Sequence, residues 1–260
     1  MTHRLEFEMP NHFQYCSDLH LEFSENEKWV RNNLPQPSSE IMILAGDIVT
    51  YQALGKHDWF FDWASDNFEQ VYWIPGNHEY YYSSIETEPS FETAIRANVH
   101  LLNNKSVVIN GTAFHFSTLW TSISRFDKSV ARGVSDYHVI GFNGRTLEVA
   151  DVNELHRRSV AFLEDALATH SDAKQVVVTH HVPTLFNYPI EFRHSTINEA
   201  FAVELETLIL KFQPKCWVYG HHHRNTPSFR IGKTWMLTNQ LGYVHKREHL
   251  GFIVGCSFEI

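Results

Sequence analysis

The chain has 260 residues, of which 43% are hydrophobic and 20% are charged, and its formal net charge at pH 7 is −9. This composition is typical of one soluble globular domain and excludes a disordered chain, a collagen and a repeat array. The acidic balance disfavours a non-specific nucleic-acid surface, which is normally basic.

Long apolar runs are missing from the sequence. Runs such as 41–45 and 176–178 fall far below the ~20 residues that span a bilayer. The first residues lack the apolar core of a secretory signal, so we expect a cytoplasmic protein with no membrane association. The three cysteines form no close pair, which predicts free, buried thiols: Cys16, Cys216 and Cys256.

The first part of the chain predicts strands with one helix between them. Residues 12–17 read as a short strand. The continuous apolar runs 41–45 and 71–74 end in Gly46-Asp47 and Pro75-Gly76, which is typical of strands buried on both faces. Residues 57–69 predict a helix with four aromatic side chains turned inward: Trp59, Phe60, Trp63 and Phe68.

The second part continues the alternation. Residues 99–117 predict two or three short strands with a hairpin turn at Asn110-Gly111. Helical spacing follows at 152–169 and again at 198–212, where one face carries Phe201, Leu205, Leu208 and Ile209. Further strands are predicted at 176–178 and 216–219, before a tail of short strands and turns.

Alternating strands and helices followed by mixed β structure predict an α/β sandwich. No linker or low-complexity segment divides residues 1–260, so we expect a single domain. Two stretches, 118–150 and 182–199, have little periodicity and many aromatic and polar residues. Long irregular loops in a compact domain are often functional, and we expect these two to select the substrate.

Five polar clusters each follow an apolar strand. They are Asp18-Leu19-His20, Gly46-Asp47, Gly76-Asn77-His78-Glu79, His180-His181 and Gly220-His221-His222-His223. Ligands of α/β sheets bind beyond the carboxyl ends of the strands, and all five clusters fall at such ends. This coincidence is the strongest signal in the sequence.

The spacing within the clusters suggests which side chains act together. In an extended segment, residues i and i+2 project to the same side, which pairs Asp18 with His20 and turns Leu19 into the core. The same period pairs His221 with His223 and turns His222 elsewhere. Of His180 and His181 only one is expected to face the site, and the spacing does not decide which.

Each cluster alone also has a purely structural interpretation. Asp18 and Asp47 are acceptable helix caps, and Asn77 suits an Asx turn. A carboxylate at the end of an apolar strand is nevertheless costly to bury unless it is paired or bound to a metal. Imidazole with carboxylate suits zinc, iron, manganese, cobalt or nickel. The clusters offer more ligands than one ion uses, so two ions sharing a bridging carboxylate is the economical interpretation.

In this order, the motifs Asp-x-His, Gly-Asp, Gly-Asn-His-Glu, His and Gly-His-x-His resemble those of the calcineurin-like metallophosphoesterases over residues 18–223. The resemblance implies a four-layer αββα sandwich with two mixed sheets flanked by helices. It also implies two metal ions, with manganese, iron or zinc favoured. The implied ligands are Asp18, His20 and His223 for the first ion, Asn77, His180 and His221 for the second, and Asp47 bridging both.

The same resemblance implies an enzyme that hydrolyses phosphate mono- or diesters. A hydroxide on or between the two metals that Asp47 bridges would attack phosphorus, and His78 would assist the leaving group without being a primary ligand. A nuclease using the same centre is an alternative that the acidic charge disfavours. A non-catalytic scaffold is disfavoured because the full ligand set is present.

A small phosphorylated molecule is therefore the expected partner. Candidate selectors are Tyr80, Tyr81 and Tyr82, which follow the Asn-His motif, and four arginines of the two irregular stretches that could pair with phosphate: Arg125, Arg132, Arg145 and Arg193. For each arginine a solvated surface position is the favoured interpretation. Metal identity, substrate and oligomeric state are left open by the sequence.

Overall fold

A computed structural model describes residues 12–86 and 90–260. Two six-stranded sheets form its centre, with strand orders β15-β1-β2-β3-β6-β5 and β13-β14-β12-β11-β8-β7. The first sheet has four parallel strands, β1 (His12–Cys16), β2 (Ile41–Ala45), β3 (Gln70–Ile74) and β6 (Val99–Asn103). Its antiparallel edges are β5 (Phe91–Arg96) and β15 (Ser257–Glu259).

The second sheet repeats this plan. Its parallel strands are β8 (Thr112–Ser117), β11 (Lys174–Thr179), β12 (Cys216–Tyr219) and β14 (Thr234–Thr238). Antiparallel edges are β7 (Lys105–Ile109) and β13 (Phe229–Ile231). The hairpin between β7 and β8 turns at Asn110 and Gly111, both with positive φ, as predicted.

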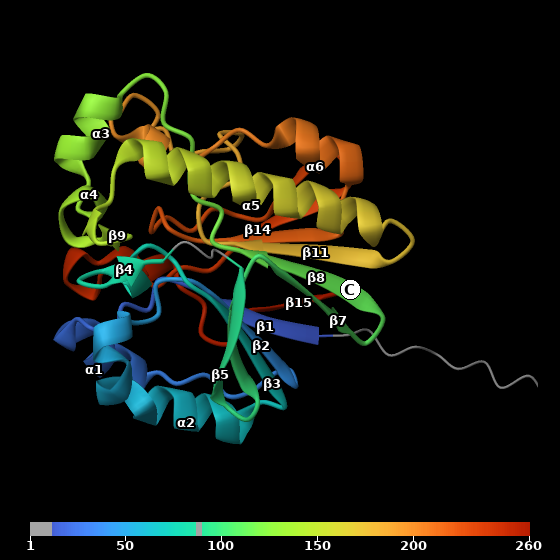
Figure 1. Cartoon of the computed structure of the whole chain (residues 1–260). Coiled ribbons are helices and arrows are strands. Elements are labelled where there is room, and N and C mark those ends of the chain that lie inside the picture. Colours follow the sequence, from blue (N-terminus) through green and yellow to red (C-terminus); the bar gives the residue numbers. More distant parts are fainter. Residues whose placement is uncertain (1–11, 87–89) are drawn as a thin grey trace, which may run out of the picture.

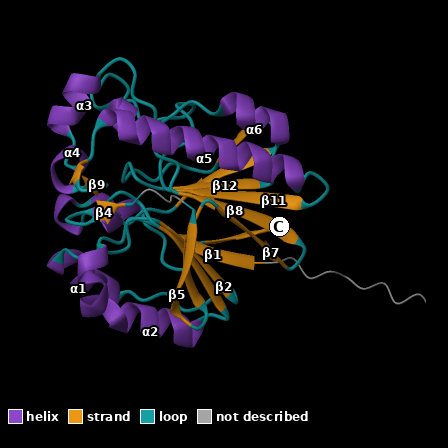
Figure 2. Ribbon diagram, viewed as in Figure 1, coloured by secondary structure: helices purple, strands orange, loops and turns teal. Residues whose placement is uncertain are grey.

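The sheets pack face to face, and helices cover their outer faces (Figure 1). In β2, Ile41 and Ile43 face the second sheet, whereas Met42 and Leu44 face the helices, which explains the uninterrupted apolar run. The helices are α1 (Ser24–Asn32) and α2 (Asp58–Asn67) on one side and α5 (Val149–Thr169) and α6 (Glu206–Phe212) on the other. The predicted αββα architecture is therefore confirmed, with strands inside and helices outside (Figure 2).

A smaller lobe lies at one end of the sheets and contradicts the prediction that 118–150 is irregular. This stretch contains α3 (Asp127–Gly133), α4 (Asp136–Val139), β9 (Gly141–Phe142) and β10 (Arg145–Thr146). β9 pairs with β4 (Ser84–Ile85), and the lobe has its own apolar cluster around Val130, Ile140 and Leu155. The elements are too short to leave a clear period in the sequence.

The predicted helix at 198–212 is confirmed only in its second part, and residues 198–205 form no α-helix. A 3₁₀ turn, η3 (Asn198–Ala200), is followed by extended residues whose amides at Val203 and Leu205 donate to the carbonyls of Val182 and Pro183. This pairing interrupts the helix, which resumes only at α6. The other 3₁₀ turns are η1 (Tyr51–His57), η2 (His78–Tyr80), η4 (Val244–Lys246) and η5 (Glu248–Gly251).

Details of the apolar packing also differ from the sequence prediction. In α2, Phe60 is buried as expected, but Phe61 is buried too, whereas Trp59 and Trp63 are only half-buried. All three cysteines are free thiols as predicted, although Cys256 is half-buried. Within residues 12–86 and 90–260, no helix combines the length and apolar character needed to cross a membrane.

Candidate metal centre

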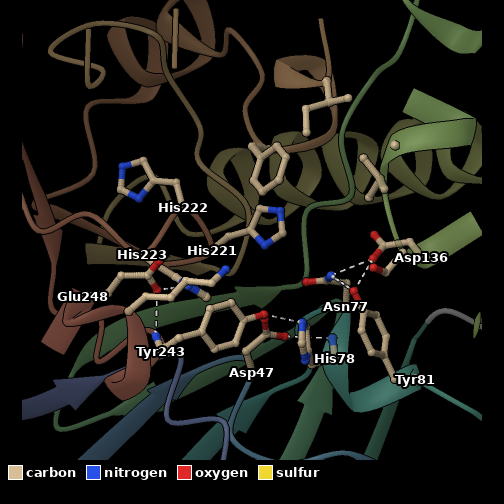
Figure 3. Close-up of a pocket in the computed structure, with 16 residues that line it drawn as sticks. Asp47, Asn77, His78, Tyr81, Asp136, His221, His222, His223, Tyr243 and Glu248 are labelled. Carbon is tan, nitrogen blue, oxygen red and sulfur yellow. Dashed lines mark hydrogen bonds and ion pairs between the residues drawn. The ribbon is translucent and has the colours of Figure 1, made fainter. Parts of the chain in front are cut away.

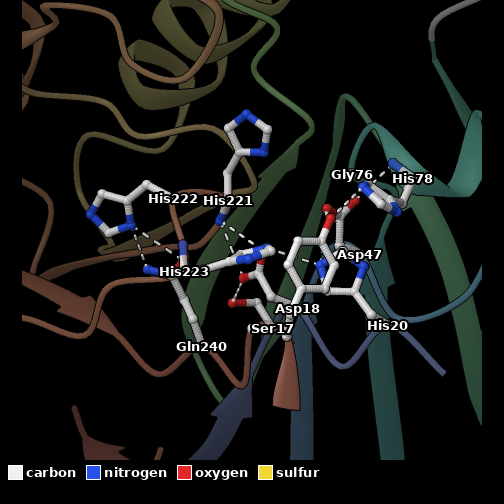
Figure 4. A network of polar contacts seen from close by, with 12 residues as sticks. Ser17, Asp18, His20, Asp47, Gly76, His78, His221, His222, His223 and Gln240 are labelled. Atoms are coloured by element: carbon white, nitrogen blue, oxygen red, sulfur yellow. Dashed lines mark hydrogen bonds and ion pairs between the residues drawn. The ribbon is translucent and has the colours of Figure 1, made fainter. Parts of the chain in front are cut away.

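The carboxyl ends of central strands from both sheets meet at one edge of the sandwich. Polar residues follow β1, β2 and β3 of the first sheet and β11 and β12 of the second (Figure 4). Because parallel strands end at the same edge, side chains far apart in the sequence converge there.

The first group consists of Asp18, His20, Asp47 and His223, whose ligand atoms all lie within 4.8 Å of one another. Nε2 of His20 lies 2.9 Å from Nε2 of His223 and 3.7 Å from Oδ2 of Asp47. Nε2 of His223 lies 3.4 Å from Oδ1 of Asp18. Two imidazole nitrogens and two carboxylates aimed at one point form a donor set that fits a transition-metal ion.

The second group consists of Asp47, His180 and His221. Nε2 of His180 lies 3.4 Å from Oδ2 of Asp47 and 3.1 Å from Nδ1 of His221. The amide oxygen of Asn77 lies 3.3 Å from the same nitrogen and adds a further ligand atom. Asp47 thus belongs to both groups, which is the arrangement required of a bridging carboxylate.

Electrostatics at the two groups favour bound positive charge. Burial acts to raise the pKa of Asp47, but the charges of His180 and His78 outweigh it and hold that pKa well below its usual value. Burial likewise opposes a proton on His180, yet Asp47 raises its pKa to about 10. Asp47 therefore favours positive charge beside it, whereas burial lowers the pKa of His20 and His221, which favours the neutral imidazole that binds a metal.

The backbone brings these side chains together by left-handed turns rather than by an extended segment. Asp18 and His20 have φ of 57° and 48°, and His221 and His223 have φ of 79° and 52°. The extended geometry predicted for Asp18-Leu19-His20 is therefore wrong, although Leu19 is in the core as expected. The pairing of His221 with His223 likewise arises from a turn after the strand.

Glycines allow the strand ends to approach each other closely. A Cβ at Gly76 would lie 2.2 Å from Oδ1 of Asp47, and one at Gly220 would lie 2.6 Å from Oδ2 of Asp18. Asp18 occupies the space left at Gly220 and accepts the backbone N–H of His221 at 3.0 Å. Any larger residue at either glycine would displace a carboxylate of the centre.

The outward-facing ring nitrogen of each histidine in the two groups contacts an oxygen. Nδ1 of His180 lies 2.9 Å from the carbonyl of Ala45, and Nε2 of His221 lies 3.3 Å from that of Ala200. In the first group the acceptors are carboxylates: Glu248 lies 2.8 Å from Nδ1 of His223, and Glu22 lies 3.3 Å from Nδ1 of His20. Such contacts fix the ring orientation and the tautomer of metal-binding histidines.

Glu79 holds the loops after β2 and β3 together. Its carboxylate accepts the backbone N–H groups of Asp47 at 2.9 Å, Ile48 at 2.7 Å and Gly76 at 2.6 Å, and the indole N–H of Trp73 at 3.2 Å. Burial and the nearby Asp47 raise its pKa to about 8. The side chain lies behind the metal groups, where it supports the loop that carries Asp47.

His78 lies beside the two groups. Its Nδ1 is 2.9 Å from Oε1 of Glu22, and its Nε2 is 3.3 Å from the hydroxyl of Tyr243. The ring stacks on Tyr81 with 4.0 Å between ring centroids. Glu22 thus bridges His78 and His20, and these three side chains form a further cluster that could contact a cation. Sequence analysis missed Glu22, although it follows His20 at the same two-residue spacing that separates Asp18 from His20.

A cavity of about 270 Å³, the metal-centre cavity, opens above these residues (Figure 3). The predicted selector stretches contribute Ile197 and the segment 133–136. A third segment, 243–248, contributes Tyr243, Lys246 and Glu248. Asp136 accepts hydrogen bonds from the amide nitrogen of Asn77 at 2.8 Å and from the hydroxyl of Tyr81 at 2.9 Å. This carboxylate turns the amide oxygen of Asn77 toward the second group.

Other predicted selectors lie away from the cavity. Tyr80 is buried against Trp120, and Tyr82 is exposed. Of the four arginines, Arg145 pairs with Asp151 and Arg132 is exposed. Arg125 and Arg193 line a separate cavity of about 370 Å³.

The neighbouring histidines His181 and His222 point away from the two groups. Nδ1 of His181 contacts the carbonyl of Thr118 at 3.1 Å, and Nδ1 of His222 contacts the side chain of Gln240. The structure thus brings together all seven predicted ligands, whereas His181 and His222 belong to neither group, although the ring of His181 lies 4.3 Å from that of His221.

Comparisons with known proteins agree with this picture. A sequence model described as calcineurin-like phosphoesterase matches residues 13–225. Uncharacterized protein L509 of Acanthamoeba polyphaga mimivirus is 30% identical over 269 residues, covering 91% of this chain and 92% of the viral protein. The solved structure of phosphopantetheinyl hydrolase from Mycobacterium tuberculosis aligns with a TM-score of 0.69 at 17% identity, covering 96% of both chains.

Proposed function

The chain belongs to the calcineurin-like phosphoesterase family, and from this membership we propose that it hydrolyses phosphate mono- or diesters at a centre of two metal ions. The observation that carries the proposal is the position of Asp47, whose carboxylate is common to two buried groups of metal-binding side chains. Asp18, His20 and His223 would hold one ion with Asp47. Asn77, His180 and His221 would hold the other.

Two bound ions supply Lewis acidity, a water of lowered pKa and charge to stabilise the phosphoryl oxygens. The contribution of the chain itself is to position groups and transfer a proton. His78 contacts Glu22 through Nδ1, so its Nε2 is directed to the cavity side, near the hydroxyl of Tyr243. From there it can donate a proton to the leaving oxygen, the role of a general acid.

The size and charge of the cavity support a small substrate over a nucleic acid. Its volume of about 270 Å³ is at the lower end for small-molecule pockets. Among the described residues that line it, Lys246 is the only lysine or arginine, and Asp47, Asp136 and Glu248 are carboxylates. A nuclease groove needs many cations to neutralise successive phosphates.

The test is hydrolysis of p-nitrophenyl phosphate and bis-p-nitrophenyl phosphate by metal-stripped protein refilled separately with manganese, zinc, iron or cobalt. We expect turnover that depends on added metal and is absent from Asp47→Asn. Two bound ions without turnover of either compound would contradict the proposed hydrolysis. The ratio of the two rates would distinguish a phosphatase from a phosphodiesterase.

A further inference from the structure

A second, smaller cavity, the annex, adjoins the metal-centre cavity. Its volume is about 150 Å³, and its walls include Tyr188, Phe192, Ser195, Ile197, Phe201 and His222. Three of these residues, Ile197, Phe201 and His222, also line the metal-centre cavity. The two cavities therefore lie side by side and share these residues as lining.

The walls of the annex are largely aromatic. The ring centroid of Tyr188 lies 6.3 Å from that of Phe192 and 5.6 Å from that of His222. Phe201 stacks on His221 of the second group at 4.8 Å, so the annex wall and the metal centre are in direct contact. Aromatic rings favour another ring in offset or edge-to-face packing at such distances.

The volume of the annex limits what it can hold. A cavity of about 150 Å³ lined by apolar side chains is large enough for one benzene molecule. The annex has this size, and it is too small for a fused ring system with substituents or for a stretch of peptide. Size, aromatic walls and contact with the metal centre thus favour a single ring.

We propose that the annex binds one aromatic ring carried on an ester arm of the substrate. This inference rests on the proposed function, because the phosphoryl group must be held at the metals for its arm to reach the annex. The expected substrate is a phosphoester with one arene-sized substituent. The segment 188–201 then selects the substrate by binding this substituent.

The test compares the methyl and phenyl esters of methylphosphonic acid, which are monoanions like a phosphodiester. Calorimetry on the metal-loaded protein measures both dissociation constants. We expect the phenyl ester to bind at least about tenfold more tightly, because the ring leaves water for an apolar site. Phe192→Ala should reduce this preference to about threefold or less, since it removes one wall of the annex.

Phe186→Ala is the matched control, because Phe186 lies in the same loop, is 59% exposed and packs on Phe229 outside the annex. It should retain the full preference. Ser195→Phe is a second test that fills the annex instead of enlarging it, and it should also abolish the preference. Metal content and thermal unfolding of each variant verify that the centre is intact.

Two results would overturn the proposal: equal binding of both esters by the wild-type protein, or a phenyl preference that survives in both Phe192→Ala and Ser195→Phe. Either can occur while bis-p-nitrophenyl phosphate is still hydrolysed with added metal, in which case the annex proposal fails and the proposed function stands. Failure of the function itself would appear as absence of metal-dependent turnover.

Discussion

The floor and the outer wall of the metal-centre cavity are built from different kinds of structure. On the floor, the ligand side chains follow central strands of the two sheets, and all but His223 are buried. The outer wall comprises 133–136, 197–201 and 243–248, which are short helices, 3₁₀ turns and loops with several exposed side chains. The floor is thus fixed by the cores of two sheets, whereas the wall can vary without disturbing them.

This contrast separates chemistry from selection. Each histidine of the floor has a second contact that fixes its ring, and Glu79 ties two of the ligand loops together. Of the charged residues of the wall, Asp136 is buried, whereas Lys246 is exposed, so water screens its charge. Substitutions on the floor should therefore remove metals or rate. Substitutions of wall residues that contact no metal ligand should change substrate binding by smaller factors. Asp136 and Glu248 are the exceptions, because they contact Asn77 and His223.

The largest effect is expected for Asp47→Asn, which keeps the shape of the side chain but removes the charge shared by both groups. Metal content should fall from two ions per chain, and turnover of bis-p-nitrophenyl phosphate should fall by about 10³-fold or more. Asp151→Asn is a control, because Asp151 pairs with Arg145 away from the cavity. Two tightly bound ions with near-normal turnover in Asp47→Asn would refute the bridging role.

His78→Ala should leave both ions bound and reduce the rate by about 10²- to 10⁴-fold for esters with poor leaving groups. The loss should be much smaller for p-nitrophenyl esters, whose leaving oxygen needs no proton. The measurement is kcat for a series of esters of increasing leaving-group pKa. His245→Ala is the control, because it changes an exposed histidine outside the cavity lining. The ratio of its kcat to that of the wild-type protein should not vary with leaving-group pKa. Loss of metal from His78→Ala would show that His78 is a ligand instead.

The floor was largely predictable from the sequence because its signal is local. An uninterrupted apolar run such as 41–45 predicts a strand buried on both faces, and a polar cluster directly after it predicts a site at the strand end. The left-handed backbone at Asp18 and His20 was not predictable, because it depends on hydrogen bonds from their amides to the carbonyls of Gly46 and Asp47 on the neighbouring loop.

The wall was predictable only in outline: 133–136 and Ile197 lie in the two stretches predicted to select the substrate, but the contacts of the wall join residues far apart in the sequence. Asp136 meets Asn77 across 59 positions, and Tyr243 meets His78 across 165. The helix α1 was missed for a related reason: its apolar residues Trp29 and Val30 are too few to give a period, and its buried Asn26 bonds to Leu19 and Gly242. In such segments tertiary contacts outweigh local propensity.

Asp136→Ala tests the point where wall and floor meet. Without this carboxylate the amide of Asn77 loses its hydrogen-bond acceptor and its fixed orientation, so we expect the affinity of one ion to fall about 10- to 100-fold. The other ion should bind as before. Titration of metal into the stripped protein, followed by calorimetry, measures the two affinities separately. Asp127→Ala, in the adjacent helix α3 and exposed, is the matched control. Equal weakening of both ions would mean that Asp136 supports the whole centre.

The smallest effect is expected on the wall itself, for Lys246→Ala. The lysine is exposed, its Nζ lies 4.6 Å from the ring centroid of Tyr243, and it lines the cavity. A screened surface cation should change KM by about three- to fivefold and leave kcat unchanged, and the change should shrink with added salt. Because a monoester carries more negative charge than a diester, its KM should rise more. Arg247→Ala is the control, because it removes an adjacent exposed cation outside the cavity lining. If Arg247→Ala changed KM as much as Lys246→Ala does, the effect would come from the overall positive charge of this segment and not from a contact made by Lys246.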